Sequence, residues 1–133
     1  MNTKELGNLG ERLACEYLVK KGFNILGKNH RISFGEIDII AQKTWKLFKN
    51  DKTIHFVEVK TIIGDGTEFF PEERVDYKKQ RKLKNLAQIW LEKNKFGQDT
   101  PYQVDIIGVL INEATRNARL HYFGNAVEDN QTK

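Results

Sequence analysis

The chain has 133 residues, a formal net charge of +4 and a hydrophobic fraction of 39%. This length suits one domain with a single core, which we assign to residues 1–127, followed by a polar tail at 128–133. No apolar run is long enough to span a membrane, and the first residues lack the apolar stretch of a secretory signal. The single cysteine, Cys15, excludes an internal disulfide and, with three scattered histidines, a conventional zinc site. We therefore expect a cytoplasmic protein that does not enter the membrane.

The basic charge is concentrated in one segment. The sequence pI of about 9.1 favours polyanionic partners. Residues 78–84 contain five Lys or Arg side chains in seven positions. Such a run is either a solvated helix face or a surface that follows a nucleic-acid backbone. The charge pattern is compatible with both interpretations.

The first half of the chain predicts one helix and three strands. Residues 3–21 have leucines at helical spacing and predict an amphipathic helix. A short strand follows at 23–31, and a second apolar strand is predicted at 35–41. Residues 42–53 are polar and lysine-rich, which indicates a long hairpin connection. The third strand is predicted at 54–60.

The second half predicts a crossover helix and a buried strand. A loop is expected at 61–70, and a helix is expected to begin at Pro71 and to end near Lys95. The continuous apolar run 104–111 is typical of a strand covered on both faces, and 119–123 could add an edge strand. A helix between two strands favours their parallel pairing. The predicted fold is therefore an α/β domain with a mixed central sheet, in the order helix, three strands, helix, strand.

Three charged side chains interrupt the second and third strands. Asp38 lies within an apolar strand, and Glu58 and Lys60 point to the same face of the next strand because strand side chains alternate. Unpaired charges are expensive to bury, so the grouping makes sense if the carboxylates hold a divalent metal and a water, as in phosphodiester hydrolysis. Oxygen ligands favour Mg²⁺ or Mn²⁺. The alternatives are a solvent-facing Asp38 and a surface Glu58–Lys60 ion pair.

One further charged residue stands out on each helix. Glu11 shares a ridge with Gly7 and Ala14 and borders the core side of the first helix, so it either reaches the metal site or pairs with a lysine. Lys79 lies at the centre of the second helix's apolar stripe, where it either extends toward solvent or delivers its ammonium to a scissile phosphate. We favour the second interpretation for Lys79. The remaining basic residues of this helix are expected to follow a nucleic-acid backbone: Lys78, Arg81, Lys82 and Lys84.

An acid also interrupts the fourth predicted strand. Asp105 is either part of the site or a buried acid paired with a base such as Arg31, and we favour the structural role. The three histidines, including His55, form no cluster in the sequence and are expected to be surface or core residues rather than ligands.

The order of these motifs resembles the YraN-like family, small bacterial proteins predicted to be endonucleases. The resemblance extends from Gly7 to Val109. It is carried by residues 10–11, 17–18, 29–31, 35–41, 56–60, 71–73, 79–80 and 104–105. One departure is Gln103, which occupies a position that is often Arg in the family.

That family resembles the PD-(D/E)xK nuclease superfamily, with distant similarity to archaeal Holliday junction resolvases. The resemblance implies a restriction-endonuclease-like core with the element order given above. It implies that Asp38 and Glu58 hold the metal with the Val59 carbonyl, and that Lys60 orients or activates the attacking water.

The same resemblance assigns roles on the two helices and a function. Glu11 would complete the metal site from the first helix, and Lys79 and Gln80 would form a polar pair on the crossover helix. The expected activity is Mg²⁺- or Mn²⁺-dependent hydrolysis of DNA, branched or junction DNA included. The alternatives are a nucleic-acid-binding module without turnover and a subunit that is active only with a partner. A homodimer is also left open.

Overall fold

The computed structural model describes residues 1–32, 34–44, 49–65 and 77–125. The predicted start of the second helix at Pro71, residues 66–70 of the predicted loop and the tail at 128–133 lie outside these residues. The described elements are α1 (Thr3–Lys20), β1 (Phe23–Ile32), β2 (Gly35–Lys43), β3 (Ile54–Ile63), α2 (Tyr77–Lys93), β4 (Tyr102–Asn112) and β5 (Asn117–Phe123).

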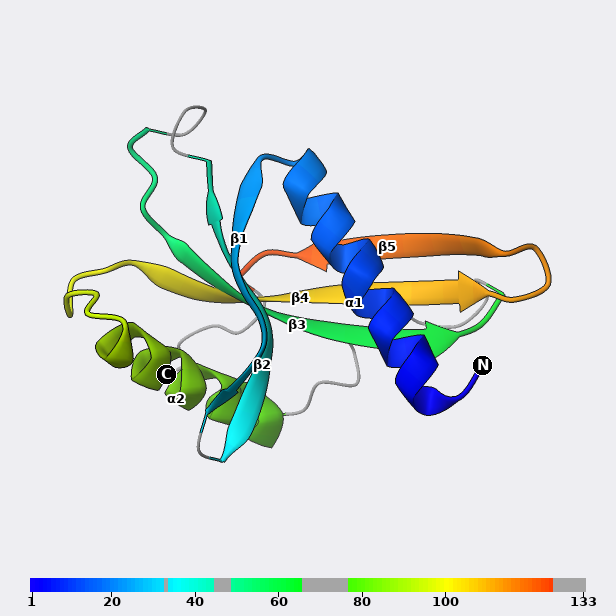
Figure 1. Cartoon of the computed structure of the whole chain (residues 1–133), viewed down its shortest axis with the longest axis horizontal. Helices are drawn as coiled ribbons and strands as arrows, with labels where there is room; N and C mark the ends of the chain where they lie inside the picture. Colours follow the sequence, from blue (N-terminus) through cyan, green and yellow to red (C-terminus); the bar gives the residue numbers. More distant parts are fainter. Residues whose placement is uncertain (33, 45–48, 66–76, 126–133) are drawn as a thin grey trace.

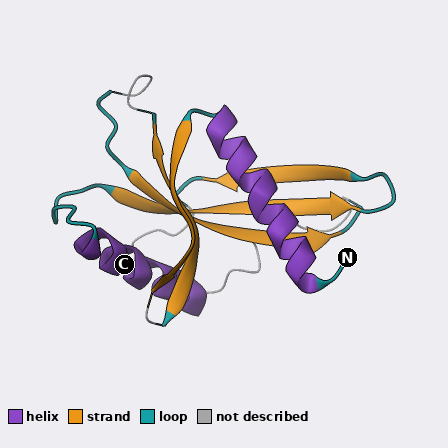
Figure 2. Cartoon of the chain, viewed as in Figure 1, coloured by secondary structure: helices purple, strands orange, loops and turns teal. Residues whose placement is uncertain are grey.

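The strands form one sheet in the order β1-β2-β3-β4-β5. Only β3 and β4 are parallel, and α2 lies between them in the sequence, while the other three neighbouring pairs are antiparallel. The two helices lie on opposite sides of this mixed sheet (Figures 1 and 2). The predicted α/β class and element order are therefore confirmed. Among the described residues, no helix is long and apolar enough to cross a membrane.

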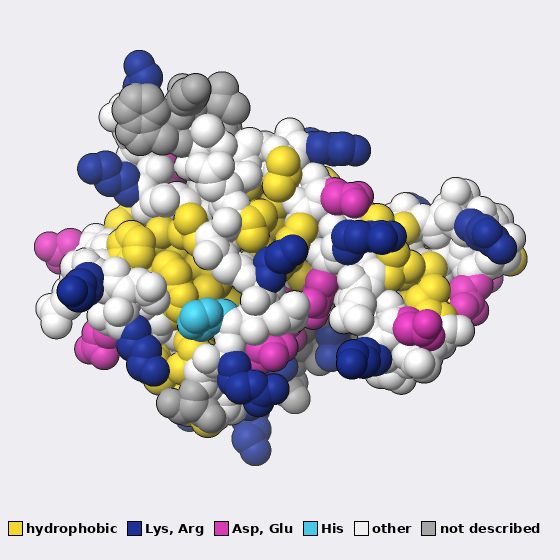
Figure 3. Space-filling view, in the orientation of Figure 1, with side chains coloured by type: hydrophobic (Ala, Val, Ile, Leu, Met, Phe, Trp, Pro, Cys, Tyr) yellow, Lys and Arg dark blue, Asp and Glu magenta, His cyan; other side chains and the backbone are white. Residues whose placement is uncertain are grey.

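Helix α1 begins at a reciprocal cap and covers one face of the sheet. The Glu5 N–H donates to Asn2 Oδ1 at 2.8 Å, and the Asn2 N–H donates to Glu5 Oε1 at 2.9 Å. Figure 3 shows this side of the molecule, where hydrophobic atoms remain exposed beside charged side chains. The buried residues between α1 and the sheet are Ala14, Leu18, Phe23, Ile39, Ala41, Val57, Ile107, Val109 and Ile111.

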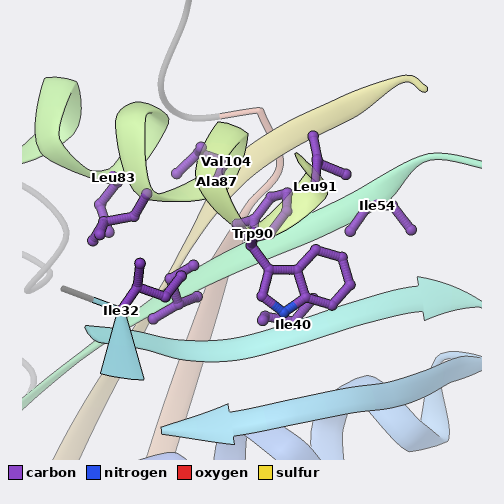
Figure 4. Packing of buried hydrophobic residues seen from close by; sticks show 11 residues of the cluster. Ile32, Ile40, Ile54, Leu83, Ala87, Trp90, Leu91 and Val104 are labelled. Atoms are coloured by element: carbon purple, nitrogen blue, oxygen red, sulfur yellow. The ribbon is translucent and has the colours of Figure 1, made fainter. Parts of the chain in front are cut away.

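Helix α2 packs on the other face through larger side chains. Trp90 lies beside Ile40 in the centre of this layer, and its ring meets Phe56 edge to face at 5.6 Å (Figure 4). The buried residues here are Ile32, Ile37, Ile40, Ile54, Phe56, Leu83, Leu86, Ala87, Trp90, Leu91 and Val104. Two separate cores therefore hold the sheet from both sides.

Several predicted boundaries differ from the observed ones by a few residues. Residues 61–63 were expected in a loop, but β3 continues through Ile63 because β4 offers a parallel partner along its whole length, up to the pair Ile63–Ile111. Helix α2 ends at Lys93 rather than near Lys95, which has a left-handed φ of 63° that interrupts a helix.

Strands β2 and β3 separate early, and this separation creates the site. They pair only between Ile39–Val57 and Gln42–Ile54. Figure 1 shows β2 turning away from β3 beyond this point. Strict alternation along this strand predicts that Ile37, Ile39 and Ala41 share one face, but Ile37 joins the α2-side core, so this prediction is wrong. Here β2 is paired with β1 alone, and the opposing β1 segment is irregular at Asn29, whose φ is 48°.

Candidate active site

The Asp38 carboxylate lies where β2 and β3 part. Its Oδ2 accepts a hydrogen bond of 2.8 Å from the Val59 N–H. If the antiparallel ladder between β2 and β3 continued, the Val59 N–H would donate to a main-chain carbonyl of β2. The side chain thus replaces a ladder bond, and this contact turns Asp38 toward β3 in spite of the gap between the strands.

The carboxyl groups of Asp38 and Glu58 lie within hydrogen-bonding reach of each other. Burial, followed by the charge of Glu58, raises the pKa of Asp38 to about 8. Glu58 is itself buried, with a side chain that is 7% exposed. Two carboxylates this close to each other, one buried and one half-buried, disfavour being ionised together unless a cation compensates them.

Lys79 reaches Glu58 from helix α2. Its Nζ lies 3.4 Å from Glu58 Oε2, and its side chain is 45% exposed. The sequence predicted that this lysine points toward the sheet, and the contact with β3 agrees with that orientation. The ammonium therefore bridges the carboxylate pair and the solvent-facing side of α2.

Glu11 approaches the pair from α1 without joining it. Its side chain hydrogen-bonds the side chain of Asn29, and its pKa is raised chiefly by burial, with further contributions from the charges of Glu36 and Glu58. Asn29 is exposed, adopts the left-handed region and falls opposite Asp38 in the β1–β2 pairing. Asn tolerates that conformation better than most residues.

Asn29 is a site residue that pattern reasoning did not single out. It appeared in the sequence only as part of a family motif. The signal available in the sequence was an asparagine within an otherwise extended segment, which is typical of a left-handed residue. Its partner could not be read from the sequence, because the packing of α1 on β1 determines it.

The other predicted residues lie around the pair. Lys60 is half-buried on β3, two residues after Glu58 and beside Gly108 of β4. Gln80 is half-buried on α2. The predicted phosphate-contacting residues Lys78, Arg81 and Lys82 are all exposed on α2, and Arg81 donates to the Tyr77 hydroxyl at 3.2 Å.

The carboxylate pair has the donor chemistry of a Mg²⁺ or Mn²⁺ site. Among the described residues, no three His, Cys, Asp or Glu side chains are grouped to hold a metal ion, so Glu11 is not in one ligand group with the pair. Magnesium is commonly held by one or two carboxylates, with waters and phosphates completing its shell. A divalent cation would also compensate the charge that raises the pKa of Asp38.

A groove of about 600 Å³ opens beside the carboxylates, between α1 and the strands β1 and β2. Glu11, Asn29 and Asp38 all line it, so the acids from α1 and β2 share one opening. We call this space the α1 groove. It is lined by Asn8, Glu11, Arg12, Cys15, Glu16, Val19, Lys20, Ile25, Lys28, Asn29, Asp38 and Ile39.

Asp105 belongs to a separate network at the other end of the sheet. It accepts hydrogen bonds from His55 Nδ1 at 2.6 Å, Tyr122 OH at 2.5 Å, Gln103 Nε2 at 2.7 Å and the Asn125 N–H at 2.6 Å. Although burial raises it, the pKa of Asp105 is lowered overall by these donors. The predicted structural role of a buried, paired acid thus agrees with the contacts.

The predicted partner of Asp105 was wrong. Arg31 instead lies on the exposed part of β1, where its Nη2 is 3.9 Å from Glu36 Oε2. The base that faces Asp105 is His55, which occupies the neighbouring parallel strand. The register of β3 against β4, which the sequence alone did not provide, determines this pairing.

The fold and the site define a class of protein: a mixed α/β domain with a carboxylate pair, one member buried and the other half-buried, at the point where two central strands separate. The chain belongs to the family described as uncharacterised protein family UPF0102, the YraN family, whose model matches residues 10–109. The predicted family is therefore confirmed.

Two relatives and one solved structure illustrate the similarity. UPF0102 protein TTE1452 of Caldanaerobacter subterraneus subsp. tengcongensis is 43% identical over 114 residues, which cover 84% of each chain. The UPF0102 protein of Dictyoglomus turgidum is 37% identical over 127 residues, covering 95% of this chain and 99% of its own. The structure of Pyrococcus furiosus SfsA in complex with Ca²⁺ is 11% identical, covers 96% of this chain and 66% of that one, and has a TM-score of 0.38.

Proposed function

We propose that this protein is a Mg²⁺- or Mn²⁺-dependent endonuclease that hydrolyses phosphodiester bonds in DNA. The observation that supports this most is the pair formed by the half-buried Asp38 and the buried Glu58, which has Lys79 on one side and an open groove on the other. A pair of carboxylates, one of them with a strongly raised pKa, beside an opening is typical of sites that perform chemistry. The basic surface of α2 supports a polyanionic substrate.

Asp38 and Glu58 would hold the metal ion, with the Val59 carbonyl as a further oxygen donor. The chemistry supplied by such an ion is activation of a water at neutral pH and neutralisation of phosphate charge. Asp38 is already fixed by the Val59 N–H, so its oxygen does not have to be ordered when the ion binds.

The two lysines would act on the phosphate and the water. Lys60 follows Glu58 on the same face of β3, where it would orient the water and offset developing negative charge. Lys79 contacts Glu58 Oε2 at 3.4 Å, and its partly exposed ammonium would contact the scissile phosphate. Gln80, Lys78, Arg81 and Lys82 would contact the strand on either side.

Cleavage of a labelled set of DNA substrates tests this proposal directly. Linear duplex, flap, four-way junction and single-stranded DNA are compared with RNA, in Mg²⁺ and in Mn²⁺. Asp38→Ala, Glu58→Ala and Lys60→Ala should each lose ~100-fold or more in rate, because each removes a charge that stabilises the transition state. Glu92→Ala, an exposed carboxylate at the far end of α2, is the matched control and should retain the wild-type rate. Wild-type cleavage by both carboxylate variants would refute the site.

Metal binding is measured separately from turnover. Titration with Mn²⁺ should raise the melting temperature of the wild type, by an amount equivalent to ~2.7 kcal/mol at one hundred times the dissociation constant. Asp38→Ala should lose this increase. If the protein binds DNA, does not bind Mn²⁺ and does not cleave, it is instead the non-catalytic nucleic-acid-binding module. Light scattering of the free and DNA-bound protein distinguishes a monomer from a homodimer.

A further inference from the structure

The α1 groove extends well beyond the carboxylates. After the turn at residues 21–22, β1 runs back beside α1, and the two elements diverge (Figure 1). The α1 side chains that line the groove span Asn8 to Lys20, a helix length of ~18 Å at 1.5 Å per residue. Glu11 and Asp38 therefore mark one part of a long channel and not a closed pocket.

The floor of this channel is apolar. Val19, Ile25 and Ile39 line it together with Cys15, and Val19 is 57% exposed. An exposed apolar strip beside a polar site is a surface on which flat, weakly hydrated groups can bind. The side-chain amides of Asn8 and Asn29 add donors and acceptors at the edge of the strip.

The rim of the channel carries three cations, Arg12, Lys20 and Lys28, all of them exposed. The acids that line it are Glu11, Glu16 and Asp38. If a divalent cation engages Asp38, the three rim cations outnumber the two remaining acids, Glu11 and Glu16. An apolar floor with a basic rim is the arrangement by which proteins bind single-stranded nucleic acids.

We propose that the α1 groove binds an unpaired DNA strand, with its bases on the apolar floor and its phosphates along Lys28, Lys20 and Arg12. This rests on the proposed function and narrows its substrate to DNA with a single-stranded segment next to the scissile phosphate. A duplex keeps its bases stacked inside and presents only phosphates, so it would leave the apolar floor unused.

Cys15 makes the groove directly testable, because it lines the floor and is the only cysteine of the chain. Burial raises the pKa of its thiol, so maleimide labelling is followed at pH 8.5. Lys60→Ala provides the background, since Lys60 neither lines the groove nor holds the proposed metal ion, and its loss suppresses the proposed cleavage. A saturating single-stranded oligonucleotide should slow labelling about tenfold, whereas a blunt hairpin duplex of the same sequence should leave the rate unchanged.

Fluorescence anisotropy of the same oligonucleotides separates the possible failures. If single-stranded DNA binds but labelling of Cys15 is not slowed, or the duplex protects equally, the groove proposal is wrong and the endonuclease proposal stands. If neither DNA binds at all, both proposals are overturned.

A matched pair of exposed apolar residues gives a second measurement. Val19→Glu places a negative charge in the groove and should weaken single-strand binding about fivefold. Leu26→Glu makes the same change at a 44% exposed residue of β1 that does not line the groove, and should leave binding unchanged. Equal effects of the two variants would mean that the charge acts at long range and would overturn the proposal.

Discussion

Two glycines of α1 should respond in opposite ways to the same substitution. Gly10 lies against β3, so that a Cβ placed on it would come within 1.9 Å of Thr61 Oγ1 and 2.9 Å of Thr61 Cβ. Gly7, one turn earlier, would have nothing within 4 Å of its new Cβ. The comparison isolates the close approach of helix and strand, because both residues lie inside one helix.

The expected magnitudes follow from helix propensity and packing. Replacing a helical glycine by alanine stabilises by ~0.5–1 kcal/mol, so Gly7→Ala should gain that amount. Gly10→Ala gains the same stabilisation from helix propensity, but overpacking against Thr61 costs ~1–3 kcal/mol. Rotation of Thr61 cannot remove the contact with its Cβ, so α1 must shift outward. We expect a net loss of ~1–2 kcal/mol for Gly10→Ala.

Urea denaturation followed by far-UV circular dichroism measures both variants. Thr61→Ala, alone and with Gly10→Ala, completes a double-mutant cycle, in which the second substitution should recover part of the loss. Because Glu11 is the next residue, Gly10→Ala should also weaken stabilisation by Mn²⁺, whereas Gly7→Ala should not. If Gly10→Ala proves as stabilising as Gly7→Ala, the close packing of α1 on β3 is incorrect.

Three further predictions concern charged residues. Burial and the charge of Glu58 raise the pKa of Asp38 from 3.8 to about 8, so the metal-free protein should lose stability as the pH rises between those values. In urea denaturation at pH 8, the free energy of unfolding of Asp38→Asn should exceed that of the wild type by ~2–5 kcal/mol. The pKa of Asp105 is lowered, so its contribution to stability is present above pH 3.8 and is lost as the pH falls further. Asp105→Asn should be less stable than the wild type at pH 7. Acid titration followed by circular dichroism should show that this variant loses less stability on acidification than the wild type does. Lys79→Ala removes the partner of Glu58 and should destabilise the metal-free protein by ~1 kcal/mol. Lys78 lies on the same turn and is exposed, so the unfolding free energy of Lys78→Ala should stay within ~0.5 kcal/mol of the wild-type value in the same measurement.

The arrangement of the fold was accessible from local patterns. The strands and helices show apolar periods of two and 3.6 residues, and these periods determine the element type. The helix between β3 and β4 in the sequence then favours the parallel pairing of these strands. The orientation of Lys79 toward β3 followed from its place in the stripe of α2.

What the sequence did not provide depends on register and on irregular backbone. The partner of Asp105 was assigned to Arg31 instead of His55, because cross-strand neighbours depend on an alignment that no local pattern encodes. Ile37 was placed on the wrong face for a related reason, since alternation holds only while a strand stays regular. The early separation of β2 and β3 also escaped prediction, although it is what allows Asp38 to contact Val59.

The bond between the Asp38 carboxylate and the Val59 amide affects how inactive proteins should be made for trapping experiments. Truncation at position 38 to alanine would leave a main-chain donor without an acceptor inside the sheet, a cost of ~1–3 kcal/mol. The isosteric amide of D38N retains an oxygen for that donor and removes the negative charge. A catalytically silent protein intended for crystallisation with its substrate should therefore carry the amide, since loss of turnover can then be separated from loosening of the scaffold.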